Sequence, residues 1–203
     1  SYDSLNAAYG YDRNNVFIYG VGGRLLFWGG DQWHYREPNT IHDLFCMWGT
    51  DINNIHSVGG EGTYRFHDGK QFQRRDELTS EEVSLYGVWG SASDDVYIVG
   101  SHGTILHFDG NEEGEWKPMV SGTDEYLLSV WGSCSNDIFA VGDNATILHY
   151  DGKSWSAMES KTDKYLTKIR GLRSDCIYAV GDDGLVIRFD GKKWNDMSLG
   201  EDA

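Results

Sequence analysis

The segments that connect the apolar stretches of this sequence carry the side chains best suited to bind a ligand. They are rich in Asp, Glu, Ser, Thr, Asn and Tyr, as in SGTDEY at 121–126 and SKTDKY at 160–165. Such groups suit a hydroxyl-rich ligand, and recognition residues concentrate on loops held by a rigid scaffold. The same composition is also typical of any solvated loop. The candidate ligand-binding residues are Glu61, His102, Asp124, Tyr126, Asn144, Asp163, Tyr165 and Asp183.

Basic residues gather near the C-terminal end of the chain, at Lys168, Arg170, Arg173 and Arg188. One interpretation is a site for an anion or a carboxylate, because arginine binds carboxylates through paired hydrogen bonds. The other is structural: these arginines pair with acidic residues of the N-terminal part, such as Asp12, and hold the two ends of the fold together. We favour the structural interpretation.

Four carboxylates, Asp43, Glu82, Asp124 and Asp163, lie near the starts of equivalent segments and form the minimum apparatus for glycoside hydrolysis. That reaction needs two carboxylates about 5–10 Å apart. The connections around them are short, and the sequence has no nucleophile motif and no phosphate-binding glycine loop. We therefore expect no catalytic residues.

Histidine and aspartate positions do not form a metal-binding pattern. His107 and His149 occupy equivalent places about 40 residues apart, which favours a structural role over convergent ligands. The recurring Asp-Gly pairs lack the dense oxygen ligands of a calcium loop and are better explained as turns. We expect neither a metal nor a cofactor.

The charge balance excludes some partners. There are 32 Asp and Glu against 17 Lys and Arg, and the net charge is −15. A nucleic acid or an anionic membrane surface would be repelled by such a chain. No run of 18 apolar residues occurs, so we predict no membrane insertion.

The three cysteines, Cys46, Cys134 and Cys176, fall at different positions of the repeat described next and form no disulfide or metal pattern.

One unit of about 40 residues is repeated five times. A glycine that ends a short apolar run marks each copy, at Gly20, Gly59, Gly100, Gly142 and Gly181. A fixed period of this length without helical patterning indicates a repeat architecture. We expect a single domain, 1–203, whose units span approximately 1–41, 42–82, 83–124, 125–163 and 164–203.

Each unit has the pattern of four short antiparallel strands. The second strand, such as VYIVG at 96–100, is apolar on both faces, so it must be covered on both sides by neighbouring sheets. Two-residue connections then predict tight hairpins with positive φ. The expected fold is an all-β, five-bladed β-propeller of about 40-residue, four-stranded blades. We expect packing between blades for Trp48, Trp89, Trp131, Trp33, Trp116, Trp155 and Trp194, the alternative being exposed platforms for sugar rings.

The unit WGSxxDDVYxVGxxGTILHYDGxxW, carried best by 89–116 and 131–155, resembles repeats of bacterial propeller proteins that are often exported. It is more distantly similar to Asp-box propellers and to the photosystem II assembly-factor propellers, and its blade number is similar to that of tachylectin, a lectin. The resemblance implies a binding scaffold rather than a reaction. It also implies a periplasmic or extracellular location, with the cytoplasm as the alternative.

These observations favour a non-catalytic recognition module. The leading hypothesis is lectin-like: several equivalent sites bind glycan weakly, and multivalency supplies the avidity. The alternative is a protein partner that docks once on the loops, as in an assembly factor or scaffold, and a glycoside hydrolase ranks third. We expect a monomer, with a larger ring built from two chains as the alternative.

Overall fold

The computed structural model describes residues 4–75, 78–110 and 115–198, and these form five four-stranded antiparallel sheets, or blades. Blade one contains β1 (Leu5–Asp12), β2 (Asn15–Gly20), β3 (Leu25–Trp28) and β4 (Trp33–Tyr35). Blade two contains β5 (Leu44–Asp51), β6 (Asn54–Gly59), β7 (Tyr64–His67) and β8 (Phe72–Arg74). Blade three contains β9 (Leu85–Ala92), β10 (Asp95–Gly100), β11 (Ile105–Phe108) and β12 (Trp116–Pro118). Blade four contains β13 (Leu127–Cys134), β14 (Asp137–Gly142), β15 (Ile147–Tyr150) and β16 (Trp155–Ala157). Blade five contains β17 (Leu166–Arg173), β18 (Cys176–Gly181), β19 (Val186–Phe189) and β20 (Trp194–Asp196).

Each blade is a meander in which every strand pairs with the next one along the chain. The second and third strands are joined by the tight turns that the sequence predicts. Their central residues have positive φ, namely 53° at Glu61, 54° at His102, 55° at Asn144 and 52° at Asp183. The prediction of an all-β, five-bladed propeller with four strands per blade is confirmed.

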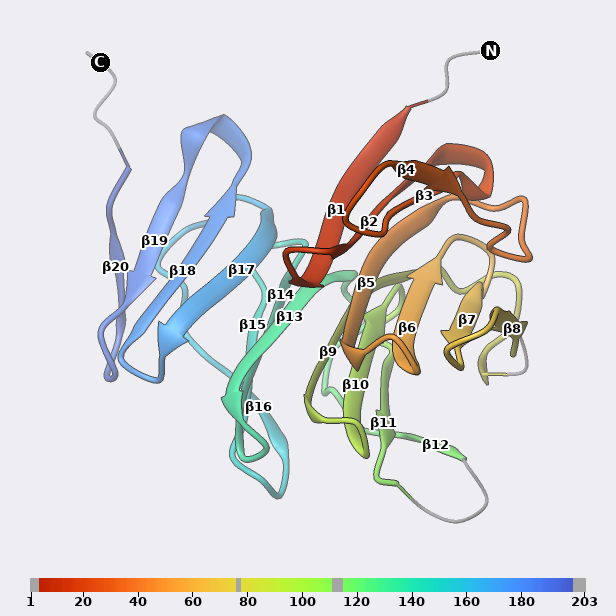
Figure 1. Ribbon diagram of the computed structural model, residues 1–203. Helices are drawn as coiled ribbons and strands as arrows, with labels where there is room; N and C mark the ends of the chain where they lie inside the picture. Colours follow the sequence, from red (N-terminus) through yellow and green to blue (C-terminus); the bar gives the residue numbers. More distant parts are fainter. Residues whose placement is uncertain (1–3, 76–77, 111–114, 199–203) are drawn as a thin grey trace.

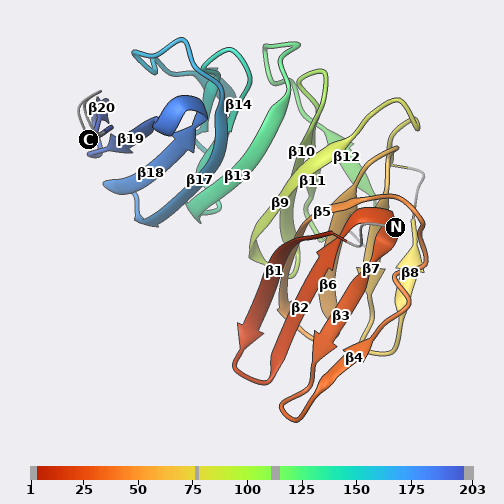
Figure 2. The ribbon, with the colours of Figure 1, turned by 90° about the horizontal axis from the view of Figure 1, so that it is seen from above.

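The first strands of successive blades lie side by side (Figure 2). A tryptophan from one blade covers a glycine of the next. A Cβ at Gly132 would lie 2.5 Å from Cη2 of Trp89, and a Cβ at Gly171 would lie 2.4 Å from Cη2 of Trp131. In blade one the equivalent ring is Tyr9, whose hydroxyl accepts a hydrogen bond of 2.9 Å from the amide of Gly49. The repeated Trp-Gly pair therefore serves packing between blades, as expected for Trp48, Trp89 and Trp131.

Four hydrophobic cores fill the four seams between consecutive blades. The aromatic residue that begins the outer strand is buried in three of them: Phe72 is 2% exposed, Trp155 8% and Trp194 1%. Trp33 has no preceding blade to pack against and is 45% exposed. The packing role holds for Trp155 and Trp194 but not for Trp33.

The blades follow an arc that is open between blade five and blade one (Figures 1 and 2). Among the described residues, none of the four cores joins these two blades. Apolar side chains on the outward face of blade five are exposed accordingly, with Tyr178 at 41% and Val180 at 39%. At the other end of the arc, Leu5 is 45% exposed.

Among the described residues, no ion pair joins the basic residues of blade five to an acidic residue of blade one. Arg173 pairs with Asp175 of its own blade. Asp12 instead accepts hydrogen bonds from Asn14 and Asn15. Arg170 donates to the carbonyl of Ile169 at 3.1 Å and lies close to that of Val130. The charge of Arg170 also acts on Tyr19 of blade one, where it partly offsets the rise that burial causes in the pKa of Tyr19.

Candidate functional site

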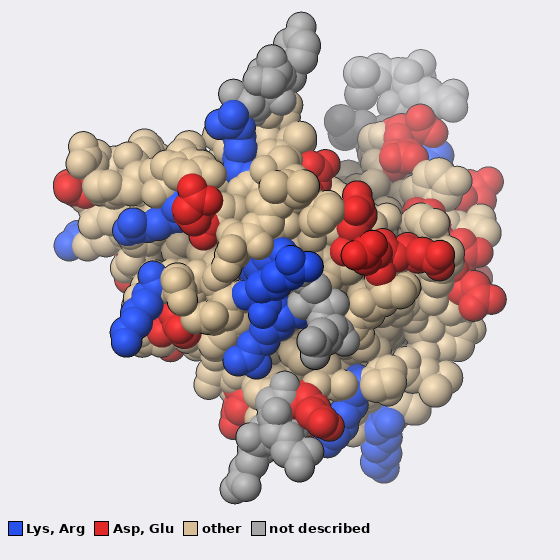
Figure 3. Space-filling model, turned by 90° about the vertical axis from the view of Figure 1, so that its right-hand side faces the viewer, with Lys and Arg blue, Asp and Glu red and all other residues tan. Residues whose placement is uncertain are grey.

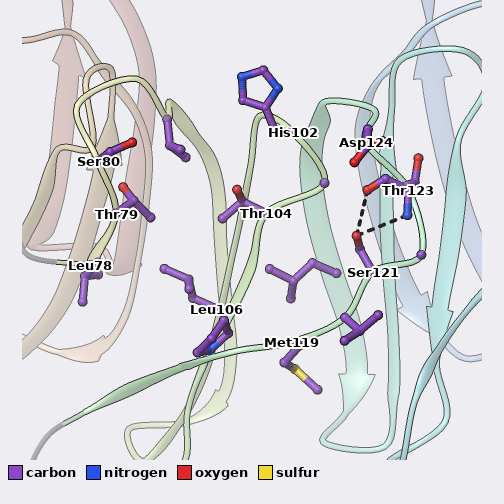
Figure 4. Close-up of a pocket in the computed structure, with 16 residues that line it drawn as sticks. Leu78, Thr79, Ser80, His102, Thr104, Leu106, Met119, Ser121, Thr123 and Asp124 are labelled. Carbon is purple, nitrogen blue, oxygen red and sulfur yellow. Dashed lines mark hydrogen bonds between the residues drawn. The ribbon is translucent and has the colours of Figure 1, made fainter.

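A groove of about 670 Å³ lies between two inter-blade connections on the outside of blade three (Figure 4). One wall is the connection from blade two, including Leu78, Thr79 and Ser80. The opposite wall is the connection to blade four, from Pro118 to Asp124. Figure 4 shows the two walls facing each other across Thr104 and Leu106, with His102 at one end.

Backbone hydrogen bonds hold the hairpins of the blades against these walls. The amide of Gly103 donates to the carbonyl of Glu125 at 2.9 Å, and the amide of Gly62 donates to that of Val83 at 2.7 Å. A Cβ at Gly103 would lie 1.9 Å from the carbonyl oxygen of Thr123, so only glycine fits here. The groove is therefore built from segments that the backbone fixes in place.

The hydroxyl groups of the connections form hydrogen bonds within their own connection and stabilise its turn. Ser121 Oγ donates to the carbonyl of Thr123 at 3.1 Å, and Thr123 Oγ1 accepts from the amide of Glu125 at 3.1 Å. The next connection repeats this turn: Ser160 Oγ donates to the carbonyl of Thr162, and Thr162 Oγ1 accepts from the amide of Lys164. These side chains are turn formers first, so fewer hydroxyl groups are free for a ligand than the composition indicates.

An exposed apolar residue distinguishes the groove from the equivalent place in the next connection. Val120 lines the groove and is 88% exposed. Glu159 occupies the corresponding position between blades four and five. The groove thus offers apolar surface where the next connection has a charge.

A row of four rings leads from the groove toward the centre of the molecule. His102 lies edge-on to Tyr126 with ring centroids 5.4 Å apart, and Tyr126 stacks on Tyr86 at 6.1 Å. Tyr86 in turn stacks on Phe45 at 5.5 Å. We call these residues the aromatic row. They come from blade two, blade three and the connection to blade four, so the packing of the blades creates the row.

The inner end of the aromatic row borders a central depression of about 330 Å³. Each blade contributes to its lining the residue that follows its first leucine, namely Asn6, Phe45, Tyr86, Leu128 and Thr167. Ala7 and Lys168 complete the lining. The sequence prediction did not include Phe45 or Tyr86. The sequence did contain a signal for these two residues: every unit shares the leucine, whereas the residue after it varies from unit to unit.

The structure divides the predicted ligand-binding residues among the blades. His102, Asp124 and Tyr126 come together at the groove and the aromatic row. Glu61 lies 3.4 Å from His42, Asn144 donates to Glu125 at 3.0 Å, and Asp183 lies 3.5 Å from Lys164. Asp163 and Tyr165 belong to the connection between blades four and five, where Tyr165 is 49% exposed. The eight residues therefore do not form one site.

The carboxylates considered for catalysis do not line the central depression. Asp124 lines the groove, and Asp43 accepts a hydrogen bond of 2.8 Å from the amide of Gly22. A carboxyl group that the sequence did not single out, Asp143, has a raised pKa because of partial burial and the nearby charges of Glu125 and Asp182.

The histidines of the repeat have structural partners. His107 Nε2 lies 2.7 Å from Asp95, and His149 Nε2 lies 2.8 Å from Asp137. In the described part of the chain, no group of three or more His, Cys, Asp or Glu residues is placed to hold a metal ion. No helix within the described ranges is long and apolar enough to cross a membrane.

The comparison with known proteins identifies the fold class, a β-propeller. No protein-family model matches the chain. No curated protein matches it by sequence either. Among solved structures, it is similar to YCF48 bound to D1 peptide, with a TM-score of 0.70 and 15% identity over 95% of this chain and 66% of that one. It is also similar to an ancestral GH74 enzyme, with a TM-score of 0.71 and 14% identity over 95% of this chain and 31% of that one. The WD40 propeller domain of Doa1 gives a TM-score of 0.74 and 10% identity over 96% of this chain and 70% of that one.

This chain thus spans about two thirds of the YCF48 chain and less than a third of the GH74 enzyme. At these identities the likeness is one of fold. A peptide-bound protein, an enzyme and a WD40 domain share it, so function has to be argued from the site.

Proposed function

We propose that this propeller is a non-catalytic recognition module that binds a segment of a protein partner along the groove and the aromatic row. The observation that carries this proposal is the continuity of the two features through His102 and Tyr126. A groove lined by apolar and hydroxyl side chains leads to stacked rings, an arrangement that suits an extended peptide with an apolar or aromatic side chain.

The asymmetry of the site favours one partner over repeated ligands. Phe45 and Tyr86 have rings at the position after the first leucine, whereas blades one, four and five have Asn6, Leu128 and Thr167 there. A multivalent lectin needs equivalent sites on several blades. A protein partner that binds once is served by the differences between blades. The YCF48 structure contains a bound D1 peptide, which supports this choice by analogy.

Glycan binding is the second candidate. It is favoured by the stacked rings of Tyr86 and Tyr126, since flat aromatic faces can pack against sugar rings. An exported location, suggested by the resemblance of the repeat, is compatible with either ligand and stays a prediction.

The test is selection of peptides from a random phage-displayed library on the wild-type chain, followed by calorimetry with the best synthetic peptide. We expect one peptide per chain and a loss of affinity of about tenfold or more in Tyr126→Ser, because a central aromatic contact is removed. The matched control is Tyr165→Ser, which changes the equivalent tyrosine of the next connection and should leave affinity unchanged.

The same preparations are screened on a glycan array. Glycan binding at two or more sites per chain, or equal losses in Tyr126→Ser and Tyr165→Ser, would contradict the proposal. Failure to select any peptide that binds the wild-type chain would also count against it.

A further inference from the structure

The seam between blades two and three contains a second cavity, of about 360 Å³, separate from the groove and the aromatic row. Its lining combines polar side chains with the rings of Tyr64, Phe66, Phe108 and Trp116. Arg75 also lines it, with its guanidinium 5.5 Å from the ring centroid of Phe66. A cavity of this size, lined by rings and a few polar groups, is typical of a small-molecule site.

Blade three differs from its siblings in the length of the connection that precedes its outer strand. In the other blades two residues separate the turn glycine from the outer-strand aromatic, as in DGKSW at 151–155. Five residues separate Gly110 from Trp116. Phe72, Trp155 and Trp194 are each buried in their seams, whereas Trp116 is only partly buried. Trp116 still packs against the preceding blade, with its ring centroid 6.0 Å from that of His56, and its more exposed ring also forms one wall of the cavity.

The polar groups at the back of the cavity satisfy one another. His56 Nδ1 lies 2.9 Å from the hydroxyl of Tyr64, and His56 Nε2 lies 3.2 Å from Oδ1 of Asn54. Burial lowers the pKa of His56 to about 3, with a smaller contribution from the charge of Arg75, so this imidazole is neutral near pH 7. A sugar would find few free hydrogen-bonding groups at this end of the cavity.

Arg75 is the cation of the cavity. Its contacts with described residues include the ring of Phe66 and no ion pair with a carboxylate. Figure 3 shows a group of Lys and Arg side chains near the middle of one side of this acidic molecule, with Asp and Glu side chains on both sides of it. Because the guanidinium already covers Phe66, a cationic ligand would be repelled there. An anionic group is attracted and can accept paired hydrogen bonds.

We propose that this cavity binds a planar aromatic ring that bears a carboxylate, with the ring among Phe66, Phe108 and Trp116 and the carboxylate on Arg75. Asp94 lines the cavity near Gly110, so the ligand's carboxylate is directed away from that side. Two sources supply this chemistry: a free aryl-alkyl acid, or the C-terminal aromatic residue of a polypeptide.

Blade one provides an internal control. Arg36 lies over Phe27 at 5.1 Å, as Arg75 does over Phe66, and both arginines directly follow the outer strand of their blade. The seam beside Phe27 is filled by the buried ring of Phe72. Blade one therefore has the same pair of arginine and phenylalanine, but the seam beside that pair is filled by the ring of Phe72.

The experiment compares indole-3-acetate with its neutral analogue indole-3-ethanol by calorimetry on the full chain. We expect the carboxylate to bind at least fivefold more tightly, Arg75→Gln to abolish this preference, and Arg75→Lys to keep part of it. Arg36→Gln should match the wild type. Circular dichroism and thermal melts confirm that each variant is folded.

Equal affinity for the two probes, no binding of either at millimolar concentration, or the same effect from Arg36→Gln would overturn the proposal. Acetyl-Gly-Trp with a free C-terminus, compared with its amide, separates the two sources. Tighter binding than indole-3-acetate indicates a polypeptide C-terminus, and weaker binding indicates a free acid. Tyr126→Ser leaves this cavity intact, so the result is independent of the proposed peptide groove.

Discussion

At the scale of single residues, His56 is a buried polar side chain at a position where the other blades have aromatic rings. The equivalent residues are Phe17, Tyr97, Phe139 and Tyr178, and His56 is only 2% exposed. Burial lowers the pKa of His56 to about 3, whereas an unfolded histidine titrates near pH 6.5. Between these values the unfolded chain binds the extra proton, so the folded state loses stability as the pH falls.

We therefore predict that His56→Phe makes folding less sensitive to mild acid. From pH 7.5 to pH 5 the wild type should lose about 2 kcal/mol more free energy of unfolding than the variant, because the imidazole no longer has to remain neutral. Urea unfolding at the two pH values measures the difference. An identical pH dependence in both proteins would show that His56 is not held neutral by burial.

At the scale of elements, the seams depend on one tryptophan and one glycine from neighbouring first strands. Gly132 accommodates Trp89 of the preceding blade, and Gly10 is its counterpart in blade one, which has no preceding blade. A Cβ at Gly10 would meet Val16 Cγ2 at 3.1 Å and no indole. The same substitution at these two places thus tests the seam itself.

Gly132→Ala should lower the free energy of unfolding by about 1–3 kcal/mol, because overpacking forces β13 away from Trp89. Gly10→Ala should cost clearly less, since Val16 can move toward the open side. Chemical unfolding of both variants provides the comparison. Equal losses would mean that another blade covers Gly10 in solution.

At the scale of the whole molecule, the open arc leaves the terminal blades with one seam each and the inner blades with two. Stability in repeat proteins is approximately a sum of unit and interface contributions, so a blade with one seam opens more easily. The open ends also expose sheet faces with residues such as Tyr178 and Val180. The arrangement of the blades, rather than the composition of any one of them, sets this gradient.

Native-state hydrogen exchange should therefore be faster in blades one and five than in blade three. We expect protection of the β1–β2 and β17–β18 amides to be at least tenfold below that of β9–β10. Uniform protection would contradict an open arc in solution, and sedimentation of the same sample would then distinguish a closed monomer from an assembly of chains.

The sequence by itself determined the repeat, the four strands of each blade, the tight hairpins and the propeller architecture. These features are encoded locally, in alternating apolar residues and in turn residues that recur about every 40 positions. It also singled out His102, Asp124 and Tyr126 as candidates, because the connections between strands can be recognised along one chain.

Only the tertiary structure shows which side chains meet in the seams between blades. Phe45, Tyr86 and Tyr126 stack although about 40 residues separate one from the next, and no local pattern records that contact. Trp116 packs against Tyr64 of the neighbouring blade, as the sequence predicts for this position, but only the structure shows that its ring also lines a cavity. The basic residues Lys168, Arg170, Arg173 and Arg188 were favoured to pair with acidic residues of blade one, such as Asp12. In the structure Arg173 pairs with Asp175, and Asp12 accepts from Asn15. Contacts between blades depend on how two surfaces match across space, which a repeat of similar units does not specify.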